Sequence, residues 1–234
     1  MSGDSSSARK RGEPRRRQEI LDAAAHVFFK KGYESASTRD IADEVGILKG
    51  SLYYYVESKE DFLFEIIKAN HLTALAALEG VRSTDGDALT KLAAIVRTHV
   101  DHFTVNYEKS VVYFRDFRSL SAERQAIINS EGDAYLDLVR DVIRQGQRDR
   151  VVDVRIDPRS TSLGIVGTLN SMVHWYRPTG RDSPAKIAAE FAAVIVTGVA
   201  SEEALAERGG LDAFRGELLA TGARRRGKPS RAAG

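Results

Sequence analysis

The segment TRDIADEVGILKGSLYYYVESKEDF, residues 38–62, constrains the fold of this chain more than any other stretch. Apolar residues at helical spacing predict a helix over 38–45, and Gly46 is a natural stop because glycine adopts the left-handed cap conformation without strain. Residues 49–56 predict a second short helix, and Ser58 opens a third. Two short helices joined by a glycine turn can enter the major groove of DNA. The sequence therefore predicts a DNA-binding protein.

The second short helix carries the predicted recognition surface. Leu52 and Val56 are four residues apart and should pack inward, which leaves hydroxyl and phenol groups on the other faces. Such groups can donate to phosphate, and an aromatic edge can lie on a thymine methyl group. Lys59 is expected to meet a phosphate together with the free backbone N–H groups of the third helix. The predicted DNA contacts are Thr38, Arg39, Lys49, Gly50, Ser51, Tyr53, Tyr54, Tyr55 and Lys59. An alternative interpretation is that the tyrosines fill a small core, although phenol groups are costly to bury unpaired.

This segment resembles the DNA-binding domain of the TetR family of transcriptional repressors, and an upstream helix ending at Gly32-Tyr33 extends the resemblance to residues 16–65. The matching residues are Thr38 to Ala42, Val45-Gly46, Lys49 to Tyr53 and Ser58 to Phe62. Two positions depart from the pattern. Leu48 stands where the family usually has a capping serine, which removes a side-chain cap worth about 1 kcal/mol. Val56 stands where the family often has phenylalanine.

Composition and charge favour an all-helical, cytoplasmic protein. The chain has 234 residues and no cysteine, and it has no apolar run near the roughly 20 residues of a membrane span. The net charge of +2 is unevenly distributed. Residues 1–17 hold six basic and two acidic residues, residues 51–220 hold 20 basic and 25 acidic residues, and residues 221–234 hold five basic residues and no acid. A basic arm beside a helix-turn-helix suits phosphate binding, although a solvated terminus is the simpler interpretation for the tail.

Four segments are expected along the chain. They are a basic disordered arm (1–15), the helix-turn-helix domain (16–62), a helical effector-binding and dimerisation domain (63–205), and a C-terminal extension with a basic disordered tail (206–234). Within the third segment, Asp157-Pro158 and Ser183-Pro184 each open a helix, because a capping side chain followed by proline suits a helix start.

The two long helices that begin at these prolines suggest a homodimer. The second is apolar over more than half of its circumference and therefore needs burial on two sides. The resemblance implies that the partner is a second copy of the chain, because TetR-like proteins dimerise through a bundle of the last two main helices of each subunit. Purely internal packing is the alternative.

Aromatic and polar residues of the middle helices suggest an effector pocket, since pockets combine apolar walls with a few polar anchors. The predicted effector-binding residues are Phe103, Tyr107, Tyr113, Phe117, Tyr135, Asn170, His174, Trp175 and Arg177. His99 and His102, three residues apart, lack the further ligands of a metal site and are interpreted as core histidines. No metal or cofactor is expected.

The stretch HWYRPTG, residues 174–180, together with GILKGSLY, residues 46–53, is similar to the KstR-two-type repressors of cholesterol catabolism, which respond to acyl-coenzyme A thioesters. The expected function is a ligand-released repressor that binds a palindromic double-stranded operator as a homodimer. An acyl-CoA thioester is the leading effector candidate. The alternatives are an efflux regulator that responds to a lipophilic drug and a non-specific DNA-packaging protein. No phosphate loop, nucleophile elbow or metal-spaced set points to an enzyme.

Overall fold

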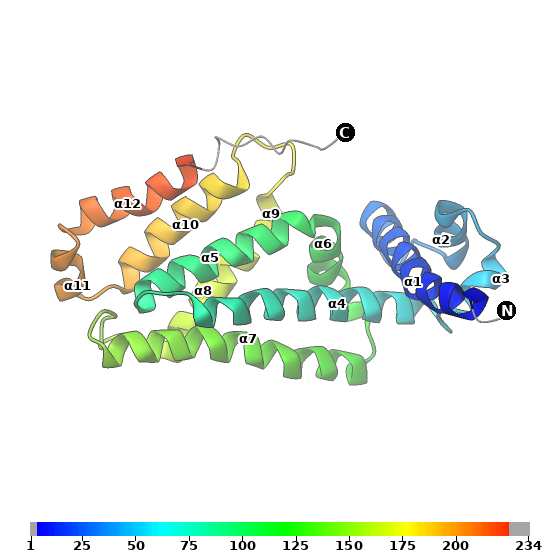
Figure 1. Cartoon of the computed structure of the whole chain (residues 1–234), viewed down its shortest axis with the longest axis horizontal. Helices are drawn as coiled ribbons and strands as arrows, with labels where there is room; N and C mark the ends of the chain where they lie inside the picture. The colour runs from blue at the N-terminus through cyan, green and yellow to red at the C-terminus, as the bar shows by residue number, and fades with distance from the viewer. Residues whose placement is uncertain (1–3, 225–234) are drawn as a thin grey trace. The chain divides into compact units, whose positions relative to one another are not determined.

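The structure, a computed structural model, describes residues 4–224, and α-helices make up most of this range (Figure 1). No strand occurs among these residues, where Val152 and Ala200 form an isolated bridge. The helices are α1 (Asp4–Lys31), α2 (Thr38–Val45), α3 (Lys49–Leu52), α4 (Lys59–Glu79), α5 (Ala88–Val105), α6 (Tyr107–Asp116), α7 (Ala122–Arg148), α8 (Pro158–Asn170), α9 (Met172–Trp175), α10 (Pro184–Val199), α11 (Glu202–Glu207) and α12 (Leu211–Arg224), with short 3-10 helices at Gly80–Ser83 and Phe117–Ser119.

Two structural units divide the chain. The first unit contains the chain up to Leu72 together with Asn106–Ser130, and the second contains Thr73–Val105 together with the chain from Glu131 onward. This division differs from the boundary expected at residue 62, because α6 and the start of α7 pack into the same core as the helix-turn-helix. Val112, Leu120 and Ile128 share that core with residues of α1 to α4.

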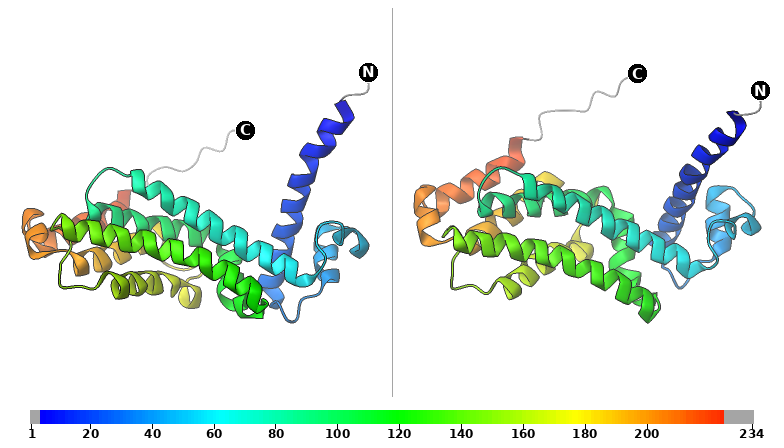
Figure 2. Two further views of the ribbon diagram at one scale, coloured as in Figure 1. Left: turned by 90° about the horizontal axis from the view of Figure 1, so that it is seen from below. Right: turned by 60° about the horizontal axis from the view of Figure 1, so that its bottom comes forward.

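Helix α1 begins earlier than expected. We predicted a disordered basic arm over residues 1–15, but α1 already includes residues from Asp4 onward, and Figure 2 shows it as one continuous helix. Residues 1–3 lie outside the described part of the chain. Arginine, lysine, alanine and glutamate favour this extension, whereas Gly12 and Pro14, which also lie within α1, oppose it, so helix propensity alone does not explain the start at Asp4. Arg15 and Arg16 both pair with Glu19, which supports this continuation.

The caps of α2 follow from its sequence. The Ser37 hydroxyl accepts a hydrogen bond from the Asp40 N–H at 3.2 Å, and the Asp40 carboxylate accepts one from the Ser37 N–H at 2.8 Å, which is a complete capping box. At the other end, Gly46 has φ 71°, so the predicted left-handed cap is confirmed. Leu48 makes no side-chain cap for α3, also as expected, and the α-helical part of α3 ends at Leu52 instead of Val56.

Ion pairs and hydrogen bonds between distant segments stabilise the first unit. Arg115 of α6 donates to the carbonyl oxygens of Phe28 and Phe29 at 2.6 and 3.2 Å and pairs with Asp116. These carbonyls belong to the last turn of α1, where helical acceptors run short of backbone partners, although the Phe28 oxygen also accepts from the Gly32 N–H at 2.8 Å. Arg115 therefore caps α1 from a helix more than 80 residues away.

A second tie joins the start of α4 to the start of α7. Glu60 accepts a hydrogen bond from the backbone N–H of Ser121 at 2.8 Å, and Asp61 pairs with Arg124. Asp61 also caps its own helix by accepting from the N–H of Ser58 at 2.8 Å. The hydrogen bond from Ser121 is the main cause that lowers the pKa of Glu60. Burial opposes such a shift at Asp61, but hydrogen bonds from Arg124 and Ser58 outweigh it and lower the pKa of Asp61 as well, so both carboxylates are charged near neutral pH.

In the second unit, α10 packs against α5 and α12, and α12 runs beside α10 in Figure 1. Asp157 and Ser183 cap α8 and α10 with Pro158 and Pro184 at the first turn, which confirms both predicted starts. The weaker helical pattern expected after residue 201 forms two helices, since Gly209 and Gly210 adopt positive φ angles of 78° and 94° between α11 and α12. Arg208 fastens this turn to Asp87 before α5.

Candidate DNA-binding surface and effector region

The predicted recognition residues lie mostly on the surface of α2 and α3. Thr38 is half-buried, whereas Arg39, Lys49, Gly50, Ser51, Tyr53 and Tyr54 are exposed. The two helices are anchored to the protein by Ile41 and Leu52, which are almost completely buried in the core of the first unit. Arg39 and Lys49 form no ion pair with another residue of the described range. Two exposed cations, two phenols and a hydroxyl therefore lie along α2, α3 and the turn that follows α3, a combination suited to phosphate and base-edge contacts.

Tyr55 differs from its two neighbours. Its side chain is half-buried, packs against the core of the first unit and meets the Tyr54 ring edge-on with centroids 5.1 Å apart. The alternative interpretation, that the tyrosines fill a small core, therefore applies to Tyr55. Tyr53 and Tyr54 are 48% and 73% exposed. Tyr55 is best described as the support on which the Tyr54 ring rests.

Lys59 does not present a free ammonium group, which corrects the expected phosphate contact. Its Nζ donates to the carbonyl oxygens of Tyr33, Glu34 and Ala36 at 2.9, 3.3 and 3.0 Å. It also lies 4.3 Å from the centroid of the Tyr33 ring. A lysine ammonium has three donors, and all three are occupied here. Lys59 therefore fastens the start of α4 to the loop between α1 and α2.

Leu48, whose only predicted effect was the loss of a helix cap, is a surface residue. Its side chain is 81% exposed in the turn between α2 and α3. An exposed leucine beside a recognition helix offers the kind of apolar contact that thymine methyl groups accept. The sequence signal for this position was the presence of an apolar residue where the family usually has serine.

The nine predicted effector residues are divided between the two units. Tyr107, Tyr113 and Phe117 belong to the first unit. There Tyr107 meets the Phe29 ring at 5.6 Å, and Tyr113 meets the Phe117 ring at 5.9 Å. The other six belong to the second unit, where Phe103 and Tyr135 are buried, Asn170 is half-buried, and His174, Trp175 and Arg177 are exposed. Helical spacing placed these residues on candidate faces but could not indicate which unit each face would join.

A polar pair lies in the interior of the second unit. The Nδ1 atom of His99 is 2.7 Å from the hydroxyl of Tyr135, and Tyr135 is only 8% exposed. Burial, with a smaller effect from the charge of His102, lowers the pKa of His99 to about 4. Burial also raises the pKa of Tyr135. Both side chains are therefore uncharged near neutral pH.

Aromatic residues lie close to this polar pair in the interior of the second unit. Phe103 lies four residues after His99 on α5, is almost fully buried and meets the ring of Tyr176 edge-on at 6.0 Å. His102 approaches Thr73, with 3.1 Å between its Nε2 atom and the threonine hydroxyl oxygen. The interior of the second unit thus combines apolar rings with neutral hydrogen-bonding groups.

One face of the second unit remains uncovered. On α8, Leu163 is 46% exposed and lies on the same face as the exposed Gly167. On α10, Val194 is 68% exposed and Gly198 follows four residues later. A Cβ atom added at Gly167 or Gly198 would meet nothing within 4 Å, so the space in front of both helices is open. Exposed apolar and small side chains at helical spacing are typical of a helix-packing surface.

Comparisons with known proteins identify the family. The N-terminal model described as bacterial regulatory proteins of the tetR family matches residues 20–66, which contain α2 and α3. The model described as tetracyclin repressor-like, C-terminal domain, matches residues 85–199. The chain belongs to the TetR family. TetR-family membership makes this protein a helix-turn-helix, DNA-binding transcriptional repressor and not an enzyme.

Several TetR-family relatives are similar over most of the chain. The HTH-type transcriptional repressor KstR2 of Rhodococcus jostii is 28% identical over 191 residues, which cover 81% of this chain and 94% of the relative. The structure of the ketosteroid transcriptional regulator KstR2 of Mycobacterium tuberculosis superposes with a TM-score of 0.73 at 26% identity, covering 80% of this chain and 96% of that one. AibR in complex with isovaleryl coenzyme A and operator DNA shares the fold, with a TM-score of 0.70 at 23% identity over 76% of this chain and 97% of its own.

Within residues 4–224, no helix is both long and apolar enough to cross a membrane. The same range contains no group of three or more histidine, cysteine or acidic residues arranged to hold a metal ion.

Proposed function

We propose that this TetR-family repressor binds a palindromic operator as a homodimer and is released by a small amphipathic effector, with acyl-CoA thioesters as the first candidates. The observation that carries the operator part is the exposed set of Arg39, Lys49, Tyr53 and Tyr54 above a buried core. The two cations are expected to meet phosphates, while Tyr54 and Leu48 are expected to meet base edges and thymine methyl groups.

The uncovered face of α8 and α10 supports the homodimer. Leu163 and Val194 leave apolar surface exposed beside glycines that permit close approach. A single helix-turn-helix contacts only half of an operator, so a two-fold axis through this face would give the pairing that a palindrome requires.

The interior of the second unit supports an effector with a neutral polar group. His99 and Tyr135 are uncharged near neutral pH and lie among buried rings such as Phe103. A thioester or ketone carbonyl is a better partner for such groups than a bare carboxylate, which would need a charged neighbour on burial. The KstR2 relatives include a protein named as a ketosteroid regulator, and AibR holds isovaleryl coenzyme A within the same fold.

Operator binding is tested by selecting bound DNA from a random pool and measuring affinity across salt concentrations. A palindromic motif bound by two protomers is expected. Lys49→Gln should lower the salt slope by about one unit, because one phosphate contact is lost. Lys30→Gln is the matched control, since Lys30 is an exposed lysine of the first unit outside α2 and α3. Equal slopes for both variants would contradict the assignment of the recognition surface.

Effector release is tested by titrating acyl-CoA thioesters, the corresponding free acids and cationic lipophilic drugs into the protein–operator complex. Release by thioesters alone supports the proposal. Linkage then requires operator DNA to weaken effector binding by the same factor. Release by the drugs alone would favour the efflux-regulator alternative, and no release by any compound would remove the effector part while leaving operator binding intact.

A further inference from the structure

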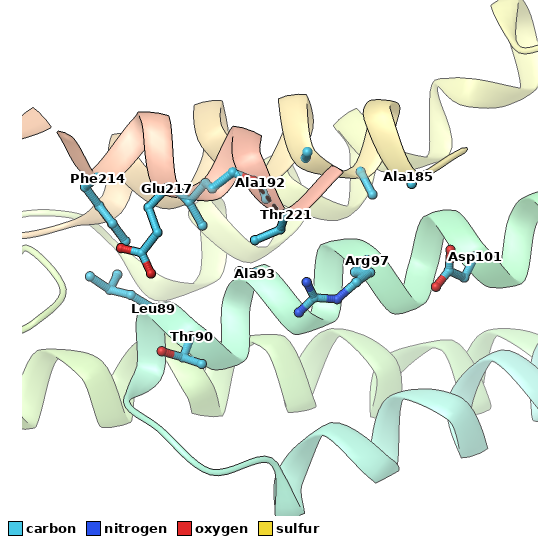
Figure 3. Close-up of a pocket in the computed structure, with 13 residues that line it drawn as sticks. Leu89, Thr90, Ala93, Arg97, Asp101, Ala185, Ala192, Phe214, Glu217 and Thr221 are labelled. Atoms are coloured by element: carbon cyan, nitrogen blue, oxygen red, sulfur yellow. Dashed lines mark hydrogen bonds between the residues drawn. The ribbon is translucent and has the colours of Figure 1, made fainter. Parts of the chain in front are cut away.

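A small groove lies between α5, α10 and α12 of the second unit (Figure 3). Its volume is about 160 Å³. None of the nine predicted effector residues lines it, so it is separate from the interior around His99 and Tyr135. Helix α12 also lies after residue 199, where the match to the C-terminal family model ends.

Small side chains create this groove. Four alanines of α10, among them Ala188 and Ala192, lie opposite Phe214 and Leu218 of α12, and Ala93 adds a further short side chain from α5. The apolar residues of α12 are nearly buried, at 6% and 8% exposure. The floor of the groove is therefore apolar and suited to an aliphatic group. An apolar cavity of about 150 Å³ is sufficient for a benzene-sized group.

Two opposite charges line the same groove without pairing. Figure 3 shows the Glu217 carboxylate extending from α12 toward α5 and the Arg97 guanidinium lying along α5. Within the described residues, neither side chain forms an ion pair or hydrogen bond with the protein. Asp101, one helical turn beyond Arg97, adds a second carboxylate to the lining. An occupant that offers both a carboxylate and an ammonium group would satisfy Arg97 and Glu217 together.

We propose that this groove binds a small zwitterion with an apolar side chain, namely an aliphatic α-amino acid of about the size of leucine. Arg97 receives the carboxylate, Glu217 receives the ammonium group, and the alanine floor receives the side chain. The binding site exists only while α12 lies against α10, so occupancy stabilises the docked C-terminal helix. This site is additional to the effector region and does not depend on which effector releases DNA.

The proposal is tested by titration calorimetry on the full chain with L-leucine and three compounds that each lack one feature. 4-Methylpentanoate lacks the amine, isopentylamine lacks the carboxylate, and glycine lacks the side chain. Leucine is expected to bind at micromolar to millimolar concentration, and each partial ligand is expected to bind at least about tenfold more weakly, because a charged partner or the apolar contact is missing. Equal binding of the partial ligands, or no leucine binding to folded protein, would overturn the proposal.

Substitutions identify the site. Arg97→Gln and Glu217→Gln should each weaken leucine binding by about tenfold or more, and Ala192→Leu should abolish it by filling the groove. Arg215→Gln is the control, because Arg215 is exposed on α12 but does not line the groove. Circular dichroism confirms that each variant is folded. Leucine affinity that is unchanged in both Arg97→Gln and Glu217→Gln places any binding elsewhere and refutes the site, whereas operator binding tests the proposed function separately.

Discussion

The ammonium of Lys59 lies above the ring of Tyr33, 4.3 Å from its centroid, and donates to the carbonyl oxygen of the same residue at 2.9 Å. One side chain thereby satisfies three carbonyls of the loop before α2. This loop leads directly into α2, so we expect Lys59 to affect DNA binding through the position and stability of that helix.

Lys59→Met should lower the free energy of unfolding by about 1–3 kcal/mol, because the loop carbonyls and the aromatic ring lose a charged partner. Urea denaturation measures this change. At a temperature well below the melting point, the salt slope of operator binding should stay at the wild-type value, in contrast to Lys49→Gln. If the salt slope of Lys59→Met instead falls by about one unit, Lys59 contacts a phosphate directly, as the sequence predicted.

The capping box of α2 predicts a response to acid. A hydrogen bond from Lys31, followed by those from Ser37, lowers the pKa of Asp40 to about 2. Because the folded pKa lies below the ordinary carboxyl value near 3.9, the stabilisation is present above that value and is lost as the pH falls toward about 2. Asp40→Asn should flatten the stability profile in this window. Ser37→Ala should lower stability by about 1 kcal/mol at neutral pH. Thermal melts at a series of pH values measure both effects.

His99 predicts a second, separate pH window. Its folded pKa of about 4 lies below the ordinary histidine value near 6.5, so the unfolded chain binds the proton more readily in this range. Stability is complete above about pH 6.5 and should fall as the pH is lowered toward 4, by at most roughly 3 kcal/mol. His99→Gln should remove this slope, whereas His174→Gln should retain it because His174 is exposed. NMR titration of the ring protons gives the pKa directly, and a value near 6.5 would contradict the expected burial effect.

The uncovered face of α8 and α10 predicts which substitutions separate protomers. Val194→Glu should give a folded monomer, because Val194 is 68% exposed in the single chain and a charge there is buried unpaired only in the dimer. Val154→Glu is a matched control at 70% exposure outside these helices. Ile195→Glu should instead destabilise the fold, since Ile195 is 9% exposed and faces the interior. Analytical ultracentrifugation separates these results, and a dimeric Val194→Glu would move the interface elsewhere.

Local sequence signals were sufficient to predict where several helices begin and end. Asp157-Pro158, Ser183-Pro184 and Gly46 each act through hydrogen bonds within a few residues, so their roles can be predicted without knowing the fold. The role of Lys59 could not be predicted in this way, because its acceptors lie 23 to 26 residues earlier in the chain.

The division of the predicted effector residues between two units could not be predicted for a related reason. Helical periodicity shows that Tyr113 and Tyr135 occupy inward faces, but not that they belong to different units. Arg97 and Glu217 also escaped prediction, since two isolated charges on separate helices form no motif in the sequence.

Arg115 affects how such regulators can be recombined. Because this side chain on α6 caps the end of α1, the unit that carries the operator-reading surface is assembled from two separate stretches of the gene. A hybrid repressor that takes only the first 65 codons from this protein would lose Arg115 and the α6 core residues with it. To exchange DNA specificity between family members, segment 106–130 must therefore be transferred together with the N-terminal DNA-binding helices. Otherwise the recipient must supply an equivalent arginine.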